Sequence, residues 1–230
     1  MLESLVSSTK ANTADKTTSL LFLDGSDDMA SSTKIIDAAN TSRLWTLTSG
    51  STMTTEVVKF GTKSFKVNGG YGLITPHDST MIQGSEYTVE MFVNIWDYSV
   101  VNFFMTKTAP DKQHPYIRQY GNLMSPDIGF DGGTGGSGDS SSTFVKGNWA
   151  HVALSVVGNS KKLFLNGVLV RNENNILTWG KNAYPFIIGA NGRRGSSDTQ
   201  GRFYAQAFRI SKVARYSNNF IPPTARFELD

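Results

Sequence analysis

Two carboxylates stand four residues apart in a segment whose side chains alternate between apolar and polar. Glu86 and Glu90 enclose Tyr-Thr-Val, and positions i and i+4 of an extended strand share one face. Paired carboxylates carry out glycoside hydrolysis, and retaining enzymes hold the two groups about 5–5.5 Å apart. The two Cα atoms would be about 13 Å apart on a strand, so only converging side chains would close the gap. Because of this separation, the sequence favours other functions over glycoside hydrolysis.

Other catalytic and cofactor motifs are missing from the sequence. His77, His114 and His151 are far apart and show no His-Glu-x-x-His spacing. The chain has no cysteine, which excludes disulfides and thiolate chemistry. Residues 133–138 satisfy Gly-x-Gly-x-x-Gly, but no helix follows them and no βαβ unit surrounds them, so a flexible loop is predicted. We therefore predict a protein that is not an enzyme, with no catalytic and no cofactor-binding residues.

Aromatic and basic residues near expected loops are candidates for ligand binding. Trp96, Tyr98 and Trp179 could stack on a sugar ring, although aromatic side chains in such positions also pack between sheets. Arg193 and Arg194 stand in a glycine-rich loop and could hold an anion, the alternative being a solvated loop.

These candidates must be positioned by strands, and a hairpin gives the clearest strand signal. Residues 163–170 form two apolar runs around Asn166-Gly167, and both central residues tolerate the positive φ of a type I′ turn. A third apolar run at 149–157 precedes them, followed by the turn residues 158–160. Three consecutive antiparallel strands are therefore expected.

Alternating patterns elsewhere extend the prediction to a β-sandwich. Phe65 and Val67 share one face of a strand, and residues 87–93 alternate in the same way. Further short strands are expected at 19–23, 100–105, 116–120, 128–130, 143–145, 186–189 and 202–210. Many short strands separated by turn residues predict one all-β, antiparallel sandwich.

Length, charge and hydropathy limit the remaining possibilities. The length of 230 residues suits a single all-β domain over 18–230. A polar segment, 1–17, precedes it and is predicted to be an arm or linker, the alternative being a disordered terminus. The net charge of +3 is spread along the chain, so no nucleic-acid surface is predicted. No run approaches the roughly 20 apolar residues of a membrane span, and the first ten residues do not form a secretion signal.

Several segments, in this order, resemble the laminin-G-like, concanavalin A-like jelly-roll family. They are residues 60–73, 87–93, 149–153, 163–167, 187–189 and 208–210. The ending at 214–224 is similar to that of such domains in bacteriophage virion proteins. The resemblance implies an antiparallel jelly-roll β-sandwich.

The resemblance also bears on the candidate sites. Glucanases of this fold carry Glu-x-Asp-x-Glu on a strand, whereas Thr88 stands at the middle position here. Laminin-G-like domains often bind calcium at the sandwich rim through oxygen-rich loops. The corresponding metal candidates are Asp24, Asp27 and Asp28, or else Asp131 and Asp139, and all five are also ordinary turn residues.

The leading expectation is a non-enzymatic surface protein of a bacteriophage virion, either a capsid decoration protein or a head fibre. It would be made in the host cytoplasm, contact other virion proteins of the capsid or tail, and form a homo-oligomer such as a trimer. The alternative is a carbohydrate-binding adhesion module of a tail or receptor-binding component, with a host surface glycan as ligand. A glycoside hydrolase ranks third.

Overall fold

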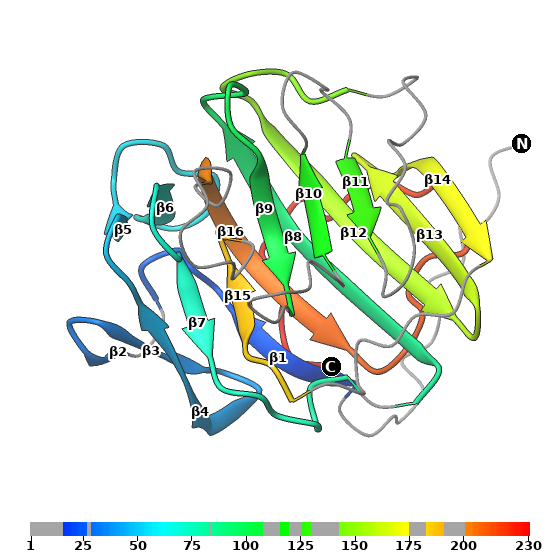
Figure 1. Ribbon diagram of the computed structural model, residues 1–230, viewed down its shortest axis with the longest axis horizontal. Coiled ribbons are helices and arrows are strands. Elements are labelled where there is room, and N and C mark those ends of the chain that lie inside the picture. Colours follow the sequence, from blue (N-terminus) through cyan, green and yellow to red (C-terminus); the bar gives the residue numbers. More distant parts are fainter. Residues whose placement is uncertain are drawn as a thin grey trace, which may run out of the picture.

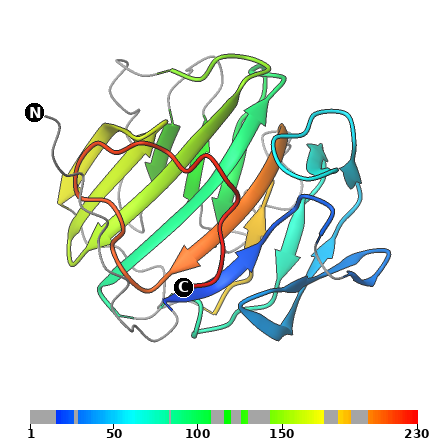
Figure 2. The same ribbon diagram turned by 180° about the vertical axis from the view of Figure 1, so that it is seen from behind.

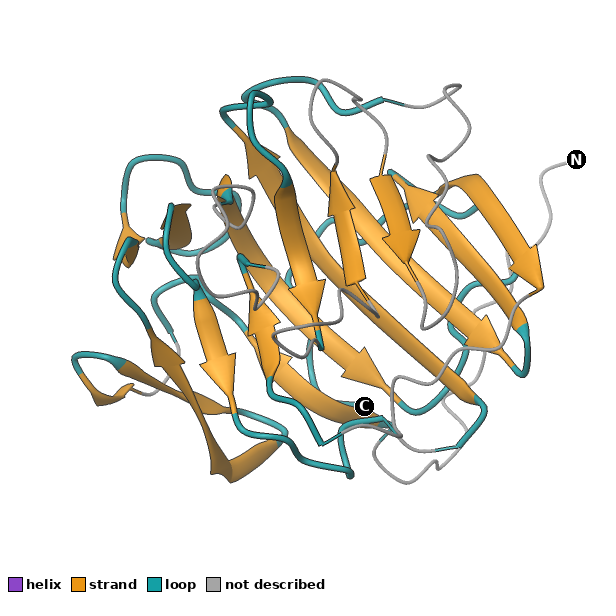
Figure 3. Ribbon diagram, in the orientation of Figure 1, coloured by secondary structure: helices purple, strands orange, loops and turns teal. Residues whose placement is uncertain are grey.

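A computed structural model gives the structure of the chain. It describes residues 16–26, 29–82, 84–107, 116–119, 126–129, 143–174, 183–190 and 201–230. These residues contain strands, turns and loops but no helix (Figure 3). No helix within the described ranges is therefore long and apolar enough to cross a membrane.

Sixteen strands form two antiparallel sheets that face each other (Figure 1). The first sheet has the order β14-β13-β12-β8-β16-β6-β5, and β1 pairs with β16. Its strands are β1 Thr17–Leu21, β5 Ser51–Thr54, β6 Ser64–Asn68, β8 Glu86–Ile95, β12 Trp149–Val157, β13 Ser160–Leu165, β14 Val168–Asn174 and β16 Arg202–Ser211.

The second sheet has the order β11-β10-β9-β15-β7-β4-β3-β2. Its strands are β2 Met29–Ser31, β3 Lys34–Asp37, β4 Asn40–Leu47, β7 Leu73–Thr75, β9 Asn102–Thr106, β10 Tyr116–Gln119, β11 Pro126–Gly129 and β15 Phe186–Ile188. The all-β sandwich predicted from the sequence is confirmed.

The predicted hairpin joins β13 to β14. Asn166 and Gly167 have φ values of 51° and 77°, as a type I′ turn requires. Asn166 also ties the turn to β12, because its backbone N–H donates to the carbonyl of His151 and its side-chain oxygen accepts from the His151 N–H. The predicted meander of β12, β13 and β14 is confirmed.

The main core fills the space between the sheets with the apolar side of each strand. Val89, Met91 and Val93 of β8 and Phe65 and Val67 of β6 all contribute to it, as their alternation predicts. The expected strand at 143–145 is wrong: these residues form an irregular segment. Its apolar signal comes from Phe144, whose ring packs into the core against Phe104 at a centroid distance of 5.5 Å.

Residues 212–230, the C-terminal tail, cross the outer face of the first sheet (Figure 2). Phe227 of the tail packs on Phe92 and Leu20 in a second, smaller apolar cluster on that face. Tyr216 and Phe220 stack on each other at 3.6 Å between ring centroids, and Phe220 also contacts Phe164. The outer face of the first sheet is thus covered by its own chain.

The start of the first strand lies beside the end of the tail. The Lys16 N–H donates to the carbonyl of Asp230 at 2.8 Å, and the Thr17 hydroxyl donates to the Asp230 carboxylate at 2.6 Å. Thr17 already belongs to β1, so the sheet begins one residue inside the arm predicted at 1–17. The rest of that arm, 1–15, lies outside the described residues.

Candidate functional site

Glu90, one of the two carboxylates of the Glu86–Glu90 pair, lies on the outer face of β8 under the C-terminal tail. Its carboxylate accepts hydrogen bonds from Arg209 Nε and Nη2 at 3.0 and 2.8 Å and from the Tyr216 hydroxyl at 2.7 Å. His151 Nε2 lies 3.1 Å from Glu90 Oε2, the same oxygen that accepts from Tyr216. Burial alone would raise the pKa of Glu90, but the bonds from His151, Arg209 and Tyr216 outweigh it and hold the pKa below the usual value. Glu90 is therefore an ionised group that fixes the tail.

Glu86 does not join Glu90 in an open site. It is the first residue of β8 and is exposed, whereas Glu90 is 1% exposed. The carboxylate of Glu90 is already paired with Arg209. The geometry thus assembles no pair of carboxylates around a space for substrate at this strand.

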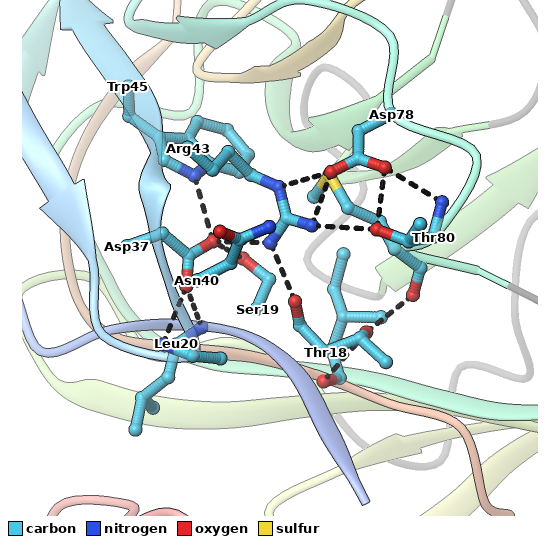
Figure 4. A network of polar contacts seen from close by, with 12 residues as sticks. Thr18, Ser19, Leu20, Asp37, Asn40, Arg43, Trp45, Asp78 and Thr80 are labelled. Carbon is cyan, nitrogen blue, oxygen red and sulfur yellow. Dashed lines mark hydrogen bonds and ion pairs between the residues drawn. The ribbon is translucent and has the colours of Figure 1, made fainter.

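A second polar network lies where β1, β3 and β4 meet the loop 76–82 (Figure 4). Asp37 is fully buried and accepts from the Ser19 hydroxyl, the Leu20 N–H and Arg43 Nη1, each within 2.9 Å. Arg43 also donates to Asp78 from Nε at 2.9 Å, which holds the loop against the strands. Every one of these groups bonds within the protein, so the network is a structural connection.

Asp24, the described calcium candidate, is already engaged by a cation of the tail. Its carboxylate accepts from the Ser26 N–H at 2.9 Å and from Arg226 Nη1 at 2.9 Å. Burial works against ionisation, but these bonds hold the pKa of Asp24 below its usual value. Asp27 and Asp28 lie outside the described residues. Among the residues that the structure describes, no three His, Cys, Asp or Glu side chains are grouped as a metal site would need.

The aromatic candidates separate into different environments. Tyr98 is 9% exposed and belongs to the main core, and a role for it in ligand binding stays a prediction. Trp96 is partly exposed, and the guanidinium of Arg202 lies 5.8 Å from the centroid of the Trp96 ring. The same guanidinium forms an ion pair with Asp97 at 2.5 Å. Trp179, Arg193 and Arg194, together with Asp131 and Asp139, lie outside the described residues.

A pocket of about 500 Å³ opens at the end of the sandwich where the turns after β2 and β4 approach β5. Six of its ten described lining residues are serine or threonine, two are apolar and one is a lysine. The lining residues are Gly25, Ser32, Thr33, Leu47, Thr48, Ser49, Ser51, Thr52, Met53 and Lys63. Its size lies within the roughly 300–1,000 Å³ typical of small-molecule sites.

The pocket presents exposed serines to solvent. Ser32 and Ser49 are exposed, whereas Ser51 Oγ is buried and has no hydrogen-bond partner among the described residues. Leu47 and Met53 are partly buried and pack against the main core, so they form a firm apolar base. The margin carries a positive charge, because Lys63 is exposed and forms no ion pair with a described residue.

Sequence reasoning missed this pocket because its residues come from four separate loops and strands. Serine and threonine in turns are common for local backbone reasons, so they give no signal of a site. The run from Leu47 to Met53 contributes six lining residues, all but Gly50, and the clustered hydroxyls there are the only local hint.

Comparison with known proteins agrees with this architecture. A model of the family described as "Concanavalin A-like lectin/glucanases superfamily" matches residues 68–217, which is more than half of the chain. A search of curated protein sequences finds no significant match.

Solved structures share the fold at low sequence identity. Trypanosoma rangeli sialidase in complex with sialic acid gives a TM-score of 0.64 at 12% identity, covering 87% of this chain and 31% of that one. The botulinum neurotoxin serotype D binding domain gives a TM-score of 0.60 at 11% identity, covering 86% and 49%. This chain spans less than half the length of either protein. With its two facing sheets and its family match, the chain belongs to the concanavalin A-like superfamily as a laminin-G-like domain.

Proposed function

We propose that this chain is a non-enzymatic recognition module that binds carbohydrate in the hydroxyl-lined pocket. The observation that carries the proposal is the composition of the wall, where Ser and Thr hydroxyls gather above Leu47 and Met53. Hydroxyls both donate and accept hydrogen bonds, so they match the hydroxyls of a sugar. The apolar base suits the C–H face of a sugar ring.

The same wall argues against hydrolysis at this site. No aspartate or glutamate is among the described residues that line it, whereas glycoside hydrolysis needs an acid and a second carboxylate. Glu90, the buried carboxylate of β8, is neutralised by Arg209 and covered by the tail. These features support binding without turnover, and a sialidase bound to sialic acid shares the fold.

A Ser32→Ala variant tests the proposal. Ser32 lines the pocket and is exposed, so the removal of its hydroxyl should leave stability unchanged while a ligand hydrogen bond is lost. One such bond is worth about 1 kcal/mol, or roughly five- to tenfold in affinity. The matched control is Ser85→Ala, at an exposed serine that does not line the pocket. Binding should be measured on a glycan array and then by calorimetry. Equal carbohydrate affinities of both variants and the wild type would refute binding in this pocket.

A bacteriophage virion is the setting that we propose for this module. The observation that favours it is the C-terminal tail, whose segment 214–224 resembles the endings of virion domains. The tail is a structural part of the sandwich here, with Tyr216 bonded to Glu90 and Arg215 paired with Asp230 at 2.7 Å. In this setting the sandwich displays the pocket, residues 1–15 dock to other virion proteins, and the chain self-associates.

Co-sedimentation with capsids that lack the protein tests the virion proposal. The full chain should sediment with them, and a variant that starts at Lys16 should remain in the supernatant, because β1 and its contacts begin at Lys16 and Thr17. A full chain that stays in the supernatant would refute the virion role, and a truncated chain that still sediments would refute docking by the arm.

A further inference from the structure

A second pocket of about 430 Å³ adjoins the first. It is formed by three segments that meet at the surface, namely the turn after β1, the loop before β6 and the C-terminal tail. Its lining residues are Asp24, Gly25, Ser26, Phe60, Gly61, Thr62, Ala225 and Arg226. Gly25 lines both pockets, and the neighbours Thr62 and Lys63 line one pocket each. The two pockets therefore share a boundary made of these three residues.

Glycine is required at this boundary. Gly25 has a φ of 92°, and a Cβ placed there would lie 2.5 Å from Thr62 Oγ1 and 3.4 Å from the Cβ and Cγ atoms of Lys63. A larger residue would have to push these side chains apart. Because Gly25 has no side chain, the boundary between the pockets leaves room beside the Thr62 hydroxyl and the base of the Lys63 side chain.

The two pockets differ in the chemistry that they present. The first offers hydroxyls over Leu47 and Met53. The second offers the ring of Phe60, which is partly exposed and held edge-on against Phe92 at a centroid distance of 5.2 Å. Arg226 is 38% exposed at its side chain and is fixed by its bond to Asp24. A hydrogen-bonding pocket thus lies next to a pocket with an aromatic surface, a combination that suits successive units of one sugar chain.

We infer that the two pockets are neighbouring subsites for a single oligosaccharide, which crosses the boundary at Gly25. This inference rests on the proposed function, because it specifies the length of the carbohydrate that the first pocket binds. The first pocket alone would admit a short sugar. Occupying the second adds contacts to Phe60 and Arg226, so affinity should rise with chain length until both pockets are filled.

An Ala225→Phe variant tests the inference by filling the second pocket. Ala225 is exposed and lines that pocket, whereas its neighbour Thr224 is exposed and does not, so Thr224→Phe is the matched control. The wild type and both variants are applied to an array of neutral and acidic glycans of one to six units. The strongest glycan and its shorter fragments are then titrated by calorimetry, and melting temperatures check that both variants fold.

The expected result is a wild-type affinity that increases about tenfold or more from the shortest bound fragment to the longer ones. Ala225→Phe should abolish this increase while retaining the affinity for the shortest fragment, and Thr224→Phe should match the wild type. An affinity that does not depend on length, or a length dependence that survives in Ala225→Phe, would overturn the inference and leave the first pocket as a site for short sugars. No binding to any glycan on the array would overturn the proposed function and the inference with it.

Discussion

Replacing Glu90 by glutamine should destabilise the protein strongly without affecting the pocket. The variant keeps the shape of the side chain but removes the charge that Arg209 and Tyr216 bind at 2.8 and 2.7 Å. Arg209 is only 8% exposed, so its guanidinium loses its hydrogen-bonded ion-pair partner in a buried position. Breaking a buried ion pair from one side costs about 3–5 kcal/mol. At about 2–4 °C per kcal/mol for a chain of this size, the melting temperature should fall by about 6–20 °C.

The matched control for this variant is Glu86→Gln on the same strand. Glu86 is exposed, so its replacement should change the free energy of unfolding by no more than about 0.5 kcal/mol. Both variants should be followed by chemical denaturation and by calorimetry with a bound glycan, and both should bind as the wild type does at a temperature where they are folded. Equal stability of the two variants would refute the structural role of Glu90, and a glycan-cleaving activity lost in either variant would refute the absence of catalysis.

Four further results are expected. Gly167→Ala should lower the free energy of unfolding by about 1–3 kcal/mol more than Gly158→Ala does in chemical denaturation. Both glycines have positive φ, but only Gly167 lies against the backbone of the tail. Equal decreases for the two variants would contradict the packing of the tail on the hairpin. Arg43→Met should cost about 3–5 kcal/mol, since it leaves Asp37 buried and unpaired, and a loss below 1 kcal/mol would refute that network. Folding lowers the pKa of the Glu90 carboxyl below its unfolded value of 4.5, so ionised Glu90 stabilises the protein above pH 4.5 and this stabilisation is lost as the pH falls through the folded-state pKa. The decrease in the free energy of unfolding between pH 5 and pH 2 should therefore be smaller in Glu90→Gln than in the wild type. Addition of EDTA should leave the melting temperature unchanged, and a decrease would point to a bound cation.

The parts of the fold that could be predicted from the sequence depend on local rules. The turn at Asn166-Gly167 follows from the two residues themselves, and the core face of β8 follows from the alternation of Val89, Met91 and Val93. Neither needs knowledge of distant segments. The family landmarks have the same origin, because each is a strand or turn with a recognisable local pattern.

The parts that could not be predicted depend on contacts between distant residues. The sequence shows Glu90 only as one of two carboxylates four residues apart, because its partners Arg209 and Tyr216 lie 119 and 126 residues away. Tyr98 stands beside a loop in the sequence, yet its ring is buried in the main core. The hydroxyl-lined pocket joins residues from Gly25 to Lys63 that share no motif. Only the folded chain brings such groups together.

The most direct test of carbohydrate recognition in the hydroxyl-lined pocket is an NMR titration of the isotope-labelled protein with the strongest glycan from the array. Backbone amide shifts should change at 25, 32–33, 47–49, 51–53 and 63, the positions that line the pocket. The amides of β8 and of tail residues 212–223 should remain unchanged, because Glu90 and its partners are covered, whereas residues 225 and 226 line the second pocket. Shifts confined to β8 and the tail, or no shifts at a saturating glycan concentration, would contradict the account.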